Sequence, residues 1–169
     1  MNDAHLHMVV NHFPIIGTIL GLGILIAGMI LKNNSVKNTA YSLFIVSAIF
    51  AFASMYTGDG AEEMVKNMPT VGKRIIHEHE EWAEKLALVL YLLGTISIAG
   101  LYATIKQNSK AKLVSLMALI VAGIAVFFAQ QTGTSGGEVR HTEIRPNAVQ
   151  ATGEAQNVET EKGEEKDNN

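Results

Sequence analysis

The chain of 169 residues contains no cysteine. This absence excludes disulfides, thiolate metal sites and the attachment of c-type haem. Proline is scarce, with only three in the chain, and residues 1–13 lack the basic segment that precedes the apolar core of a signal peptide. We therefore expect the first apolar segment to remain in the protein as a helix.

Charge is missing from four long apolar segments, none of which contains Asp, Glu, Lys, Arg or His. These segments are 13–31, 39–57, 86–105 and 113–131. Each has about the 20 residues that a helix needs to cross a hydrocarbon core of about 30 Å. A buried bundle in a soluble protein is the alternative, but each of its helices would show a polar face. The sequence therefore predicts an all-α membrane protein with four transmembrane helices.

Short loops at 32–38 and 106–112 join these helices in pairs, which predicts an up-down-up-down four-helix bundle. We expect one transmembrane domain over residues 1–145, with helices at about 13–31, 39–57, 82–105 and 113–131. Between the second and third helices, the spacing of Asp59 and Glu62 predicts a short interfacial helix over Met64–Met68. Residues 146–169 contain almost no large apolar side chains, which predicts a disordered acidic tail.

Lysine is concentrated in the two short loops, which contain no acid. The residues are Lys32, Lys37, Lys106, Lys110 and Lys112. The positive-inside rule places these loops in the cytoplasm and both termini outside. Taking the source as bacterial, we expect a multi-pass protein of the inner (cytoplasmic) membrane with periplasmic termini. The lipid bilayer is the expected partner, no nucleic acid is indicated, and a homo-oligomer is left open.

Several motifs occur twice, at a near-constant offset. A His-x-His pair stands at 5–7 and again at 77–79, while a Thr-Gly pair stands at 57–58 and again at 132–133. Such offsets predict a duplicated helical hairpin, with the two copies related by an axis along the membrane normal.

The six histidines all lie near membrane boundaries on the expected outer side: His5, His7, His12, His77, His79 and His141. Neutral imidazole binds haem iron, copper and zinc, although a single interfacial histidine needs no such role. Helical spacing places His79 on an apolar face that turns toward the bundle, and His77 on an acidic face that turns toward water. We expect the glycines at 133–137 to turn the chain sharply, folding His141 over the bundle mouth.

These motifs resemble those of an uncharacterised family of four-helix bacterial membrane proteins. The matching residues, within 5–141, are His5, His12-Phe13-Pro14, Thr57-Gly58, His77 or His79, Gly136-Gly137, Val139 and His141. Arg140 departs from the family, in which an aromatic residue is common at that place. Relatives are sometimes joined to Rieske-type or cytochrome modules. The resemblance therefore implies electron transfer, b-type haem and a redox partner such as a cytochrome or Rieske protein.

The leading hypothesis is a membrane-embedded electron-transfer subunit that binds b-type haem near the periplasmic face. Its candidate ligands are His12, His79 and His141, with His12 facing His79 across the bundle. One alternative is a copper- or zinc-binding membrane protein without haem, for which His5, His7 and His77 are further candidate ligands. Another is a structural or assembly subunit without a cofactor. No arrangement of nucleophile and base is recognisable, so an autonomous enzyme is not expected, and no residue demands a quinone site.

Overall fold

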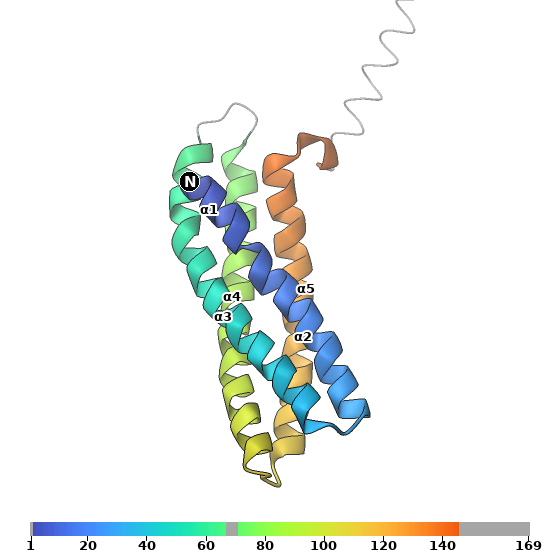
Figure 1. The fold of residues 1–169 in the computed structure, drawn as a ribbon. Coiled ribbons are helices and arrows are strands. Elements are labelled where there is room, and N and C mark those ends of the chain that lie inside the picture. Colours follow the sequence, from blue (N-terminus) through green and yellow to red (C-terminus); the bar gives the residue numbers. More distant parts are fainter. Residues whose placement is uncertain (1, 67–70, 146–169) are drawn as a thin grey trace, which may run out of the picture.

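The computed structural model describes residues 2–66 and 71–145, which form a bundle of long helices (Figure 1). In chain order the elements are α1 (Asp3–Val10), α2 (His12–Ile30), α3 (Asn34–Val65), α4 (Lys73–Ile105), α5 (Ala111–Arg140) and a 3-10 helix, η1 (Thr142–Ile144). There is no strand in this part of the chain. The predicted acidic tail and residues 67–70 lie outside the described residues.

Four helical stretches are long and apolar enough to cross a membrane, namely α1 with α2, α3, α4 and α5. Helices adjacent in sequence pack against one another, and α2 also packs against α5. The helices α2, α3, α4 and α5 run in alternating directions, and α1 runs on into α2 in the same direction (Figure 1). The predicted all-α, up-down-up-down bundle with four transmembrane helices is therefore confirmed, and it is compatible with a multi-pass membrane protein.

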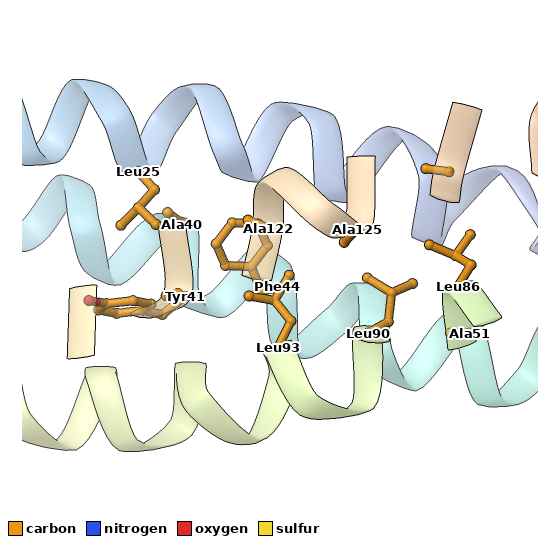
Figure 2. Packing of buried hydrophobic residues seen from close by; sticks show 12 residues of the cluster. Leu25, Ala40, Tyr41, Phe44, Ala51, Leu86, Leu90, Leu93, Ala122 and Ala125 are labelled. Carbon is orange, nitrogen blue, oxygen red and sulfur yellow. The ribbon is translucent and has the colours of Figure 1, made fainter. Parts of the chain in front are cut away.

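Small residues line the face of α5 that turns inward. Ala118, Ala122 and Ala125 are completely buried there, and they belong to the same core cluster as Phe44 and Leu93 (Figure 2). Small side chains let helix backbones approach closely, which favours association where no hydrophobic effect drives it. Large apolar side chains instead cover the outside of the bundle, as lipid contact requires.

The two short loops have the same backbone geometry. Lys32 and Gln107, which stand at corresponding places in the two hairpins, have φ angles of 51° and 50°. The next residues, Asn33 and Asn108, each donate the backbone N–H to the carbonyl five residues earlier, at 3.0 and 2.8 Å. Each asparagine side chain also accepts the N–H of the residue two positions later, at 2.9 Å. This shared pattern supports the predicted duplication of the hairpin.

The predicted interfacial helix over Met64–Met68 is wrong for the residues described, because α3 continues without a break to Val65. The extension has a packing partner, since α1 lies against this end of α3. At Gly60 the approach is so close that an added Cβ would lie 2.9 Å from Asp3 Cβ. A tertiary contact therefore stabilises helix where the sequence predicted a new element.

The sharp turn predicted at residues 133–137 is also wrong, because α5 remains helical to Arg140. Gly136 instead lets the His79 ring lie close to the backbone of α5, since an added Cβ would lie 2.9 Å from Cε1 of His79. His141 consequently follows the end of α5, with its N–H donated to Gly137 O at 2.8 Å, and its side chain is exposed. It is not folded over the bundle mouth by a glycine turn.

Candidate functional site

The short helix α1 positions the first histidine of the site. The Asn2 side chain caps α1 by accepting the His5 N–H at 2.9 Å, and the helix ends where Asn11 separates it from α2. Pro14, in the first turn of α2, has no N–H to donate, which favours an interruption of the helix here. The interruption is slight, because Asn11 keeps helical φ and ψ angles of −68° and −17°. The segment before it, α1, packs across the end of α3 (Figure 1).

His7 is partly buried between α1 and α3. Its Nδ1 atom lies 3.1 Å from the Ser54 carbonyl oxygen and 3.2 Å from Thr57 Oγ1. Because a carbonyl oxygen can only accept, the bond to Ser54 requires the proton on Nδ1. The Nε2 atom then keeps its lone pair, and this is the tautomer that can bind a metal through Nε2.

His79 is partly buried between α4 and α5, as its apolar helix face predicted. Its Nδ1 atom lies 3.1 Å from Ser135 Oγ. The Ser135 hydroxyl also lies 3.2 Å from Thr132 O, to which it can donate its own proton. In that arrangement its oxygen accepts from the imidazole, so that His79 holds the proton on Nδ1 and leaves Nε2 free.

The two partly buried histidines occupy corresponding places in the two hairpins. His7 and His79 are the second members of their His-x-His pairs, and each bonds to the last part of the second helix of its own hairpin, α3 or α5. Both rings lie at the end of the bundle opposite the two lysine-rich loops, and we call this end the histidine end.

The outer members of the two His-x-His pairs face away from the bundle. His5 and His77 are both exposed. As its acidic helix face predicted, His77 lies beside carboxylates, at 3.3 Å from Glu81 and 3.7 Å from Glu80. Burial thus distinguishes the inner histidine of each pair from the outer one.

His12 and His141 are both exposed and form hydrogen bonds with residues close to them in the sequence. His12 is exposed, and its Nδ1 bonds to the Met8 carbonyl on the preceding helix. His141 is exposed with Nδ1 2.8 Å from Glu143 Oε1. Hydrogen bonds from the Glu143 backbone N–H and from the His141 ring lower the pKa of the Glu143 carboxyl. Of the three predicted haem ligands, His79 is thus partly buried while His12 and His141 are exposed, and the ligand roles of all three stay predictions.

The repeat of the His-x-His pair could have predicted that His7 faces inward, although the residues beside His7 do not indicate it. If the hairpin is duplicated and His79 faces inward, the corresponding histidine of the first pair should face inward too. Among the described residues, no three His, Asp or Glu side chains form a group that could hold a metal ion.

No family model matches the chain, and neither a curated protein nor a solved structure is found to be similar to it. The resemblance to the four-helix family stays a prediction.

Proposed function

We propose that the chain is a membrane-embedded electron-transfer subunit that would hold b-type haem at its histidine end through His7 and His79. The observation that carries this proposal is that both imidazole rings make the same kind of hydrogen bond through Nδ1. Each directs Nδ1–H at a fixed acceptor and keeps the Nε2 lone pair. Protein-bound metals commonly have histidine ligands oriented by such a second hydrogen bond.

The number of donors favours haem over the copper or zinc alternative. A structural zinc site takes four protein ligands, and a catalytic one takes three. A haem iron already has four porphyrin nitrogens, so it needs only one or two ligands from the protein. His7 and His79 supply two imidazoles, and the part of the chain that the structure describes adds no third side chain to make a metal group.

Three buried hydroxyls have no hydrogen-bond partner in the described part of the chain, those of Ser47, Ser97 and Thr132. Thr132 is the one on the same turn of α5 as Ser135, whose hydroxyl bonds to the Thr132 carbonyl. A buried donor without a partner costs about 1–3 kcal/mol, so such groups call for an explanation. Bound haem would supply one-electron chemistry, while the residues of this chain orient the two imidazoles.

The expected orientation places the haem near the periplasmic face. The lysine-rich loops lie at the opposite end from His7 and His79, and the positive-inside rule assigns those loops to the cytoplasm. A redox partner such as a cytochrome or Rieske protein would then reach the haem from the periplasm.

The test uses the full chain, purified in detergent after expression with ample haem. We expect a Soret band and, in pyridine haemochrome spectra, the signature of b-type haem. His7→Ala and His79→Ala should each lose most of the haem. His5→Ala and His77→Ala are matched controls, because each removes an exposed histidine two positions from a proposed ligand.

Two results would overturn this proposal. One is wild-type protein that stays free of haem under these conditions, with copper or zinc found instead by metal analysis of protein prepared without added metal. The other is haem retained by both His7→Ala and His79→Ala but lost on His12→Ala or His141→Ala, which would restore the ligand set favoured by the sequence.

A further inference from the structure

The end of the bundle opposite the histidines is strongly basic. Its loops and adjoining helix turns, residues 31–41 and 104–115, contain five lysines and no acid. No described carboxylate is therefore available from these segments to neutralise them. We call this region the lysine end.

Lys37 differs from the other four lysines because it is buried, with only 9% of its surface exposed. It stands one helical turn before Tyr41, on the face of α3 that points into the core. Its stem packs against α2 so closely that a Cβ added at Gly28 would lie 2.8 Å from Lys37 Cγ. Lys37 thus forms the last layer of the core at the lysine end.

The amine of Lys37 makes no hydrogen bond or ion pair with any described residue. The stem of Lys37 is buried, while its ammonium group is not among the buried polar atoms and so reaches the surface of this end. The positive end of the α3 helix dipole, close by, adds to the positive potential there. An unpaired ammonium group among four other lysines at a membrane boundary therefore fits an anionic partner from outside the chain.

Exposed apolar side chains surround this end and indicate what kind of anion fits. Ile30 and Leu31 are 74% and 67% exposed at the end of α2, and Ile105 and Leu113 are 63% and 58% exposed beside the other loop. A free phosphate ion would pair with the amine but leave these side chains uncovered. A lipid would meet both requirements, because its acyl chains cover the apolar residues while its headgroup meets the lysines.

We propose that the lysine end binds the headgroup of an anionic phospholipid, whose phosphate pairs with the ammonium group of Lys37. The four exposed lysines, Lys32, Lys106, Lys110 and Lys112, provide the long-range attraction. Basic sites between transmembrane helices recognise anionic headgroups in this way. The site lies at the other end of the bundle from His7 and His79, so it is independent of haem binding.

The test is native mass spectrometry of the full chain in detergent, titrated with phosphatidylglycerol or phosphatidylcholine with identical acyl chains. We expect phosphatidylglycerol to be retained preferentially. Lys37→Met keeps the apolar stem and removes the charge, and it should lower that preference roughly fivefold. Lys37→Arg should keep the preference. Lys66→Met, at the other end of α3, is the matched control and should behave as the wild type.

Equal retention of the two lipids by the wild type would overturn the proposal, as would an unchanged preference in Lys37→Met. Displacement of phosphatidylglycerol by millimolar inorganic phosphate would overturn the choice of a lipid as the ligand. Helix content by circular dichroism, together with the behaviour of Lys37→Arg, separates loss of the site from loss of the fold.

Discussion

His79 and Ser135 join α4 to α5 through a hydrogen bond of 3.1 Å between Nδ1 and Oγ, across 56 residues of sequence. When the serine proton is donated to the Thr132 carbonyl, 3.2 Å away, this contact orients the imidazole with its proton on Nδ1. The same state is reached at His7 through a backbone carbonyl instead of a hydroxyl. The Nδ1 atoms of His7 and His79 therefore each have a hydrogen-bond partner, although the two partners are of different kinds.

Ser135→Ala removes the acceptor for the His79 Nδ1–H. Loss of such a partner typically weakens binding by about 10- to 100-fold, so we expect the haem affinity to fall by this much with the bundle intact. Haem titration followed at the Soret band measures it. Ser42→Ala, which removes an exposed hydroxyl bonded within its own helix, is the control. Equal haem affinities for Ser135→Ala and Ser42→Ala would contradict the role assigned to Ser135.

Gly136→Ala places a methyl group 2.9 Å from Cε1 of His79. We expect the imidazole to be displaced and haem binding to be weakened, even though alanine favours helix. Gly123→Ala on the same helix meets nothing within 4 Å and should raise stability by about 0.5–1 kcal/mol. Thermal unfolding and haem titration of both variants provide the measurement. If Gly136→Ala bound haem as tightly as Gly123→Ala, the contact with His79 would carry no function.

Gly21→Ala brings α2 into conflict with the core. An added Cβ would lie 2.5 Å from Phe44 Cε1, and the Phe44 ring is completely buried. Overpacking of this kind costs about 1–3 kcal/mol. Unfolding in denaturant from a fixed detergent should show that loss, and the double variant with Phe44→Leu should recover part of it. Gly23→Ala, which meets nothing within 4 Å, should not be destabilised; a loss equal to that of Gly21→Ala would point to helix propensity instead of packing.

Tyr41→Phe removes a hydrogen bond of 2.8 Å between the Tyr41 hydroxyl and Ser115 Oγ, which links α3 to α5. The serine hydroxyl also bonds to the Ala111 carbonyl, so it is not left without a partner. We expect a modest loss of about 0.6 kcal/mol, typical of such bonds between membrane helices. A double-mutant cycle with Ser115→Ala isolates the interaction. A coupling energy of zero would show that this bond does not stabilise the bundle.

The four apolar segments predicted the four membrane-length helices correctly because a membrane allows few other structures for such segments. A spanning segment must be about 20 residues long and must satisfy its backbone hydrogen bonds internally. Hydropathy did not predict how far the helices extend beyond the apolar segments: α3 reaches Val65 and α5 reaches Arg140. Outside the hydrocarbon, local turn signals compete with packing. The glycines near the end of α5 remain in the helix, and Gly136 lies close to His79.

The sequence by itself determined the number of spanning helices, their alternating directions and the separation of lysines from histidines, because these depend on local hydropathy and charge. Only the tertiary structure decided which histidines are partly buried. His7 reaches Ser54 over 47 residues of sequence because α1 packs against α3. Pro14 marks where the first helix is interrupted, but only the packing of one helix against another defines which side chains meet across it. The six histidines near one end of the bundle were visible in the sequence, and the fold distinguished His7 and His79 by their burial.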